Sequence, residues 1–424
     1  MGQPPRRIVL STLGSLGDLH PMMGLALELR ARGHDVVLAS SEFYRQKVAR
    51  AGLEFHALRP LLSPDDPAMV ASVMRSPRGP EVLIRDLVLP HLRDMYEDLL
   101  EASSGADYLV CGELVMAAPL VAEKRNLRRA AAILAPFSFF SAHDPVVLPM
   151  MPFGGALARA PLTVQKALLG TAGLLTHHWL EPIRALRREL GLRAEVRPLL
   201  GDRFSPTLNL ALFATELGAP QPDWPRNTTQ TGFVFHDEPA APARADSNLE
   251  AFLSSGEPPV VFTLGSAAVM AAGSFFEEAA RAARQLGRRA LLVLGENRIG
   301  EAPSSELFAI DYAPYSQVFP RAAAVVHQGG AGTTAQALRA GVPQLIMPYG
   351  FDQPDNAARI ARRGIGLTLP RKRFRAGRVA SVLRQLLTDP GYSARARSAA
   401  QRLASARGVP VACDAIERDM GGRQ

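Results

Sequence analysis

Residues 326–334 read Val-His-Gln-Gly-Gly-Ala-Gly-Thr-Thr, and this stretch determines both the expected fold and the expected ligand. The apolar residues 323–326 predict a buried strand that ends at His327. A glycine turn follows, and a helix is expected to open at about Gly332. Backbone N–H groups of such a turn can approach a phosphate closely, and the helix N-terminus adds roughly half a positive charge. We therefore predict a diphosphate site made of His327, Gly329, Gly330, Gly332 and Thr333.

A second block, residues 348–356, reads Pro-Tyr-Gly-Phe-Asp-Gln-Pro-Asp-Asn and follows the next predicted strand, residues 344–347. Asp352 and Gln353 place a carboxylate beside an amide, and such a pair suits the hydroxyl groups of a sugar. Asp352 could equally cap a helix over residues 355–363, and the two roles do not exclude each other. A diphosphate site followed one strand later by a hydroxyl-binding pair suggests a nucleotide-sugar donor.

The ordered pair of motifs, His-x-Gly-Gly-x-Gly-Thr and then Asp-Gln-Pro, resembles the donor signature of the family 1 glycosyltransferases. The likeness is to the bacterial branch that includes the rhamnolipid rhamnosyltransferase and the glycopeptide-antibiotic glycosyltransferases. It covers most of the chain and fades between about residues 60 and 200. The resemblance implies an α/β protein of the GT-B fold, in which two Rossmann-like doubly wound domains face a central cleft.

The order of apolar segments agrees with two such domains. Residues 8–13 and 36–39 predict buried strands separated by a helix, and such alternation is typical of a parallel sheet. A second alternating series begins at residues 259–266, whose Thr-Leu-Gly-Ser echoes residues 12–15. Because ligands of doubly wound sheets bind at the carboxyl ends of the strands, we expect the ligand to lie beside Gly14, Gly265 and Ser266.

Stretches rich in proline and alanine mark the expected boundary between the domains, and a strand-like piece, residues 231–235, lies between them. We predict an acceptor-binding domain over residues 1–235, a linker over 236–245, a nucleotide-sugar-binding domain over 246–395 and a C-terminal helix over 396–424. The sequence leaves open whether this last helix packs back on the first domain.

Residues 136–176 differ from the rest of the chain: the stretches 136–140 and 148–155 are apolar but broken by proline and glycine, and they predict loops or short helices. Ordinary core packing and an apolar acceptor pocket both explain this composition.

The chain has 424 residues, a net charge of +8 and a pI of about 9.9, which raises the question of nucleic acid or an anionic membrane. The basic residues are mostly arginines spread along the chain, without an aromatic-interleaved stripe, so we expect no nucleic-acid partner. The densest cluster, residues 371–375, suggests at most peripheral membrane contact.

Cys111 and Cys413 show no metal or redox spacing, which suits a reducing compartment. We expect no signal peptide and no transmembrane helix, and therefore a cytoplasmic protein.

The catalytic base is expected after the first strand. Family members often carry Gly-His-x-x-Pro there, and residues 17–21, Gly-Asp-Leu-His-Pro, put Asp18 in the histidine position. The antibiotic branch also has Asp at this place, so the resemblance implies Asp18 as the base. His20 is the rival, because imidazole titrates near neutrality, and a plain helix cap is the structural alternative for Asp18. Glu113 lies near the place of the family's helper acid.

Residues 311–317 occupy the place where the plant branch carries a base-packing Trp-x-Pro-Gln segment. Tyr312 takes the Trp place and Tyr315 the Gln place, and a tyrosine can stack on a base. This departure leaves both UDP and dTDP open. The chain has no Asp-x-Asp, so we expect no metal, with the glycine amides and His327 stabilising the diphosphate instead.

The leading hypothesis is an inverting, metal-independent enzyme without a cofactor. It would move a glucose- or rhamnose-type hexosyl group from a UDP- or dTDP-sugar to a hydroxyl of a lipophilic natural product or hydroxy-lipid. A GT-B nucleotide-sugar epimerase is an alternative. An NAD-dependent oxidoreductase is disfavoured because no Gly-x-Gly-x-x-Gly follows residues 8–13. A non-catalytic partner subunit is disfavoured because both donor motifs are intact. The sequence leaves the acceptor, the sugar and the oligomeric state open.

Overall fold

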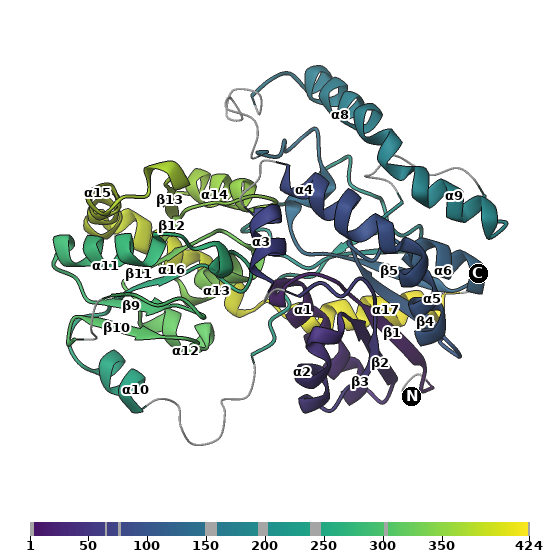
Figure 1. Cartoon of the computed structure of the whole chain (residues 1–424), viewed down its shortest axis with the longest axis horizontal. Helices are drawn as coiled ribbons and strands as arrows, with labels where there is room; N and C mark the ends of the chain where they lie inside the picture. The colour runs from purple at the N-terminus through teal and green to yellow at the C-terminus, as the bar shows by residue number, and fades with distance from the viewer. Residues whose placement is uncertain are drawn as a thin grey trace.

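The computed structural model describes residues 4–63, 66–74, 78–148, 159–193, 202–237, 247–300 and 304–422. Two parallel sheets lie side by side, each with helices on both faces (Figure 1). Within the described ranges, no helix combines the length and the apolar character that crossing a membrane requires.

The first sheet has the strand order β3-β2-β1-β4-β5-β6-β7, and all its neighbours are parallel. Its strands are β1 (Arg7–Ser11), β2 (Asp35–Ser40), β3 (Glu54–Ala57), β4 (Tyr108–Gly112), β5 (Arg128–Ile133), β6 (Leu208–Ala211) and β7 (Thr228–Gln230).

The second sheet has the order β10-β9-β8-β11-β12-β13 and is also parallel. Its strands are β8 (Val260–Thr263), β9 (Ala290–Val293), β10 (Leu307–Ile310), β11 (Ala324–His327), β12 (Gln344–Ile346) and β13 (Gly366–Thr368).

The α-helices of the first half are α1 (Leu16–Ala31), α2 (Arg45–Arg50), α3 (Pro67–Met74), α4 (Gly79–Glu81), α5 (Leu92–Ala102), α6 (Ala118–Arg125), α8 (Leu162–Thr176) and α9 (Glu181–Glu189). Those that follow are α10 (Ser247–Ser254), α11 (Phe275–Leu286), α12 (Tyr315–Val318), α13 (Ala331–Ala340), α14 (Gln353–Arg362), α15 (Ala376–Thr388), α16 (Pro390–Ala404) and α17 (Gly408–Gly421).

Both sheets reverse their strand order at the same place, and this place fixes where a ligand can bind. In the first sheet β1 lies between β2 and β4, and in the second β8 lies between β9 and β11. At such a reversal the connections that follow two neighbouring strands run to opposite faces of the sheet. A crevice therefore forms between them at the carboxyl ends of the strands. The predicted pair of doubly wound sheets is therefore confirmed, and the echoed Thr-Leu-Gly-Ser segments follow or end β1 and β8.

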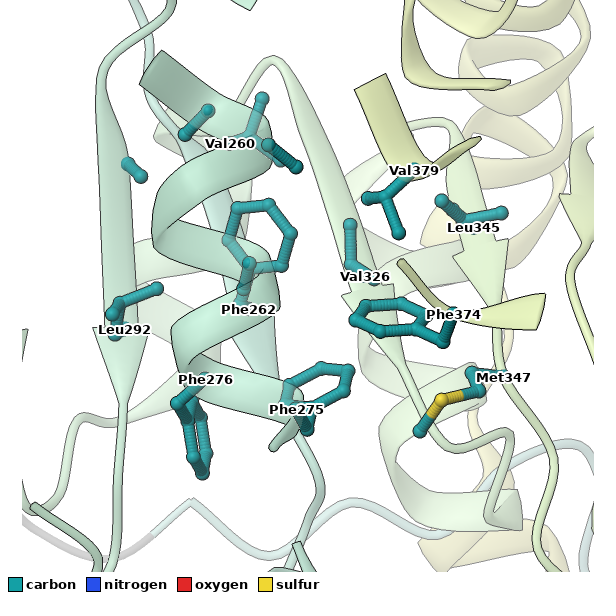
Figure 2. Packing of buried hydrophobic residues seen from close by; sticks show 14 of the residues in the cluster. Val260, Phe262, Phe275, Phe276, Leu292, Val326, Leu345, Met347, Phe374 and Val379 are labelled. Atoms are coloured by element: carbon teal, nitrogen blue, oxygen red, sulfur yellow. The ribbon is translucent and has the colours of Figure 1, made fainter. Parts of the chain in front are cut away.

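Aromatic packing holds the core of the second half (Figure 2). The ring of Phe262 on β8 meets the ring of Phe275 on α11 edge-on, and the Phe275 ring stacks on Phe374 with centroids 4.7 Å apart. All three side chains are nearly fully buried, and burial of side chains this large contributes on the order of 2–3 kcal/mol each. This core fixes β8 and thus the turn that follows it.

The C-terminal segment consists of two helices that contact different halves, whereas the sequence predicted one helix over residues 396–424. Helix α16 packs against α13, and α17 packs against α1 (Figure 1). Arg32 of α1 bonds Asp414 at 2.6 Å and Glu417 at 2.7 Å, both on α17. The chain thus returns to the first half, while the predicted domain boundaries themselves stay a prediction.

One local expectation was wrong. Residues 231–235 form no strand, because β7 ends at Gln230 and Gly232 has a φ of 89°, which interrupts the pleat. Residues 136–139 form a short 3₁₀ helix, as the sequence predicted, and residues 162–176 add one long helix, α8. The predicted linker falls mostly on residues 238–246, which lie outside the described residues.

A buried ion-pair network joins the halves. Arg359 of α14 is 3% exposed and binds Asp355 on its own helix, with Nε 2.6 Å from the carboxylate oxygen. Its Nη1 binds Asp144, which follows β5 in the other half. Asp355 in turn accepts a hydrogen bond from the backbone N–H of Val147 at 3.0 Å. The loop over residues 144–147 is therefore tied to the helix that carries Asp352 and Gln353 at its start.

We expect Arg359→Ala to lower the free energy of unfolding by about 3–5 kcal/mol, because it leaves the fully buried Asp355 without its counter-ion. Arg362→Ala is the matched control: this neighbouring arginine also contacts Asp144, at 3.4 Å, but is 53% exposed and should cost at most about 1 kcal/mol. Urea unfolding measures both changes, and equal losses would contradict a special role for Arg359.

Candidate active site

One continuous cavity of about 1210 Å³ lies between the carboxyl ends of the two sheets. Among the described residues, its walls include most of the positions that the sequence singled out: Gly14, Asp18, His20, Glu113, Gly265, Ser266, Tyr312, Tyr315, Gly330, Gly332, Thr333, Asp352 and Gln353. His327 and Gly329 lie behind the wall. The fold therefore brings together residues that are up to about 340 positions apart in the sequence.

The two turns on the donor side are shaped by glycines. Gly265 has a φ of 65°, and a Cβ on it would lie 2.3 Å from Nε2 of Gln328. Gly330 has ordinary extended backbone, but a Cβ there would lie 2.9 Å from the same nitrogen. The turns after β8 and β11 therefore close around Gln328 only because neither glycine carries a side chain.

Helices α1 and α13 begin on opposite sides of the cavity and approach each other at their N-termini. A Cβ on Gly332 would lie 3.9 Å from the Cα of Gly17 in the other half. Helix α13 starts at Ala331, one residue before the predicted Gly332. The positive ends of two helix dipoles thus converge on one point, which favours an anion there.

His327 is placed differently from the prediction of direct phosphate contact. Its side chain is completely buried, Nδ1 accepts the N–H of Gly329 at 3.0 Å, and Nε2 lies 2.9 Å from Oε1 of Gln344. Nε2 therefore carries the proton, and both ring nitrogens are used inside the protein. Burial lowers the pKa of His327 to about 4, so the ring is neutral at pH 7. Through its bond to the N–H of Gly329, His327 holds the glycine turn in position.

Gln328 faces the cavity instead, and no pattern in the sequence distinguishes it as a site residue. Gln328 is only 6% exposed, and its side chain lies between Gly265 and Thr333. Nε2 is 3.4 Å from Oγ1 of Thr333. Within the described chain Oε1 has no hydrogen-bond partner, and a buried amide of this kind calls for one. Only the fold shows this, because Gln328 follows the last residue of β11 and its side chain is directed by the turns at Gly265 and Gly330.

Asp18 takes part in the cap of α1 and also lies in the wall of the cavity. It is the third residue of α1 and accepts hydrogen bonds from N and Oγ of Ser15, at 2.8 and 3.2 Å, in a capping box. It also lines the cavity. Burial, opposed by the Ser15 bonds and aided by the charge of Glu113, raises its pKa to about 6. At pH 7 the group is mostly ionised but basic enough to take a proton.

His20 and Glu113 lie on the same side of the cavity and are engaged by other residues. The His20 ring meets the His236 ring edge-on, with centroids 5.5 Å apart. Glu113 accepts a hydrogen bond from Oγ of Ser138 at 2.7 Å and lies 3.1 Å from Nη1 of Arg203. The ionised Glu113 therefore acts on Asp18 mainly through its charge.

Asp352 and Gln353 stand across the cavity from Asp18. Asp352 makes no side-chain cap of α14; instead it accepts a hydrogen bond from Nδ2 of Asn356 at 2.7 Å. Burial, with a smaller contribution from the charge of Asp18, raises the pKa of Asp352 to about 7. Oε1 of Gln353 accepts the backbone N–H of Tyr349 at 2.9 Å, so the amide nitrogen is what Gln353 can offer a ligand.

The two tyrosines of residues 311–317, Tyr312 and Tyr315, lie in different surroundings. Tyr312 is 60% exposed at the cavity and presents a ring face of the kind on which a base stacks. Tyr315 is locked by a 2.7 Å bond between its hydroxyl and Oγ1 of Thr263 and by stacking on Phe319. Burial raises the pKa of Tyr315 to about 12.

The far part of the cavity is apolar. Its lining includes Met69, Val70, Leu83, Phe137, Phe140, Leu168, Leu169 and Trp179. The segment over residues 136–176 therefore contributes walls through its described residues, while residues 149–158 lie outside them. Nowhere in the described ranges do three or more His, Cys, Asp or Glu side chains group as metal ligands would.

Comparison with known proteins identifies the family. The description "Glycosyltransferase family 28 N-terminal domain" matches residues 8–122, and "Erythromycin biosynthesis protein CIII-like, C-terminal domain" matches residues 296–416. O-mycaminosyltylonolide 6-deoxyallosyltransferase of Streptomyces fradiae is 37% identical over 97% of each chain. The chain belongs to the family 1 glycosyltransferases, in their bacterial branch.

Two further matches agree with this assignment. Glycosyltransferase GtfC of Amycolatopsis orientalis is 30% identical over 86% of each chain. The crystal structure of glycosyltransferase VinC in complex with dTDP superposes with a TM-score of 0.70, at 21% identity, over 98% of this chain and 99% of that one. The glycosyltransferase described here therefore has the GT-B fold and is of the natural-product type. Nothing in these comparisons supports the epimerase alternative.

The neutral, buried His327 should make stability depend on pH. The pKa of His327 is 6.5 in the unfolded chain and about 4 in the folded one. Between pH 4 and pH 6.5 the folded state therefore binds fewer protons than the unfolded state. This contribution is fully present above pH 6.5 and is lost as pH falls toward 4. The excess stability of the wild type over His327→Gln should thus shrink by about 3 kcal/mol from about pH 7 to about pH 4.

Urea unfolding of both proteins across this range measures the difference, and Asp18 and Asp352 cancel because both proteins contain them. A difference that stays constant with pH would contradict a neutral His327.

Proposed function

We propose that this glycosyltransferase moves a hexosyl group, with inversion, from a dTDP- or UDP-sugar to a hydroxyl of a lipophilic natural product. The observation that carries the proposal is the single cavity, in which Asp18 stands opposite Asp352 and Gln353. Two helix N-termini converge at one end of this cavity, and apolar side chains form the other. The first end suits a diphosphate and the second a lipophilic acceptor.

A dTDP-linked 6-deoxyhexose is the donor that we favour. VinC, a structural relative, is described as a complex with dTDP. The 37% identical relative is named as a 6-deoxyallosyltransferase. Tyr312 offers the exposed ring face for the base, and Asp352 with the amide of Gln353 offers groups for the sugar hydroxyls.

Asp18 acts as the general base in the proposed reaction. The acceptor hydroxyl gives its proton to the Asp18 carboxylate while its oxygen forms the new bond to the anomeric carbon. The bond between that carbon and the diphosphate oxygen breaks, and its electron pair leaves with the diphosphate. Attack from the side opposite to the leaving group inverts the anomeric centre.

The departing diphosphate is stabilised by the first N–H groups of α13 and by the second Nε2–H of Gln328, whose other Nε2–H is directed at Oγ1 of Thr333. His327 holds Gly329 in place for this task and does not touch the ligand. Neutral donors and helix dipoles thus supply the electrostatic stabilisation, so we propose that no metal ion is required.

The donor proposal is tested by thermal shift with dTDP, UDP, dTDP-rhamnose, UDP-glucose and NADH. We expect dTDP species to raise the melting temperature by several degrees, because selective binding to the native state stabilises it. Gln328→Ala should weaken dTDP binding about tenfold, the value of a hydrogen bond to a charged group. Stabilisation by NADH alone would overturn the proposed function.

Asp18→Asn is expected to lower turnover by about 10²–10⁴-fold while dTDP still binds, because the amide cannot take the proton. His20→Gln is the matched control and should keep most of the activity. In the wild type kcat/KM should fall below about pH 6, where Asp18 becomes protonated. An active Asp18→Asn variant beside an inactive His20→Gln variant would transfer the base role to His20.

EDTA is expected to leave turnover unchanged, because the proposed leaving-group stabilisation comes from protein groups. The measurement is the initial rate with and without chelator. Activity that depends strictly on added Mg²⁺ or Mn²⁺ would contradict this part of the proposal.

A further inference from the structure

Arg203 is a largely buried cation in the wall of the cavity and has no role in the transfer chemistry described above. Arg203 lines the cavity, its side chain is only 18% exposed, and it lies between the rings of Phe140 and Phe204 at 5.3 and 5.0 Å from their centroids. In the described part of the chain, Nε and Nη2 have no hydrogen-bond partner. Buried guanidinium donors without partners are costly, and a ligand that supplies an acceptor relieves that cost.

The backbone around Arg203 is held in place by another buried arginine. Arg129 of β5 is 6% exposed and donates from Nη2 to the carbonyl of Asp202 at 2.8 Å and to that of Phe204 at 2.7 Å. Its Nη1 donates to the carbonyl of Arg203 at 3.2 Å. The three bonds fix the segment from which Arg203 extends, so the guanidinium is presented by a rigid support.

Phe140 adds a second sign of a built site. It is not a glycine, yet its backbone has a φ of 46°, in the left-handed region that large side chains rarely adopt. Strain of this kind persists where the surrounding structure enforces it, and functional sites are common places for it. Here the result is that the Phe140 ring meets the Arg203 guanidinium.

The charge balance decides which kind of ligand fits. Glu113 lies 3.1 Å from Nη1 of Arg203, so the pair is neutral overall. A carboxylate bound at Nε and Nη2 would come close to the carboxylate of Glu113 and be repelled by it. A neutral oxygen with lone pairs, such as a ketone or ester carbonyl, would accept from the free donors without that repulsion.

We propose that Arg203 binds a neutral carbonyl oxygen of the acceptor and thereby orients the acceptor in the cavity. The proposal rests on the proposed function in one respect, that the apolar part of the cavity receives the acceptor. Glu113 is near enough to Asp18 for its charge to raise the Asp18 pKa, so the carbonyl site lies in the neighbourhood of the proposed base. Arg203 is a specificity-determining residue in this scheme and takes no part in bond breaking.

The test uses cyclododecanone and dodecanoate as probes and dTDP as the control ligand. Binding is followed by tryptophan fluorescence, because Trp179 lines the cavity. The wild type should bind the ketone more tightly than the carboxylate. In Arg203→Met, which keeps an unbranched stem between the rings, the Kd of the ketone should rise about tenfold or more, with dTDP binding unchanged. Arg226→Met, an exposed arginine outside the cavity, is the matched control.

Glu113→Gln provides an independent test, because it keeps the shape of the side chain and removes its negative charge. It should leave the ketone Kd unchanged and tighten dodecanoate binding about tenfold, since the guanidinium then lacks a counter-ion. The Glu113→Gln variant still tests the proposal if Arg203→Met fails to fold.

Several results would overturn the proposal: an unchanged ketone Kd in Arg203→Met, tighter binding of dodecanoate than of ketone by the wild type, or no effect of Glu113→Gln on dodecanoate. If dTDP binds and neither probe does, the carbonyl site is refuted while the proposed function stands. If dTDP also fails to bind, the proposed function fails with it.

Discussion

Arg359 holds the two halves of this enzyme in the arrangement on which its cavity depends. Its guanidinium lies between Asp355 of its own helix and Asp144 of the other half, and all three are largely buried. Around it, an apolar cluster draws side chains from both halves, among them Phe139, Trp224, Leu338 and Ile360. The apolar contact supplies non-directional attraction, and the charged network fixes the orientation. Because α14 begins with Gln353, the same contact sets where the sugar-side groups stand relative to Asp18.

Burial shifts the pKa values of two carboxyl groups that line the cavity, Asp18 and Asp352. Burial raises the pKa of Asp18 to about 6 and that of Asp352 to about 7, and the charge of Asp18 contributes to the second shift. Asp18 is therefore the group that is ionised first as pH rises, and Asp352 keeps a proton for longer. A carboxylate opposite a carboxylic acid gives one proton acceptor and one hydrogen-bond donor, which are different tasks performed by the same residue type.

Much of the architecture follows from local patterns in the amino-acid sequence. The alternation of apolar strands and capped helices indicated two parallel sheets, because a strand buried on both faces has to be apolar along its length. The glycine turn after residues 323–326 and the Asp352–Gln353 pair indicated the donor side, because local motifs carry their own backbone geometry. Thirteen of the fifteen predicted site positions line the cavity, and His327 and Gly329 are the exceptions. These signals are local, so the linear sequence contains them.

The other features of the site depend on contacts between segments that are distant in the sequence. His327 and Gln328 are neighbours in sequence, but the register of β11 beside β12 puts the first against Gln344 and turns the second toward the cavity. Arg203 lies about 90 residues from Glu113 and had no motif to mark it. The long helix α8 followed a segment broken by proline and glycine, and its cavity-facing side became evident only against Phe137 and Trp179. Side-chain direction, charge pairing and burial arise from contacts between distant segments, and no single segment specifies them.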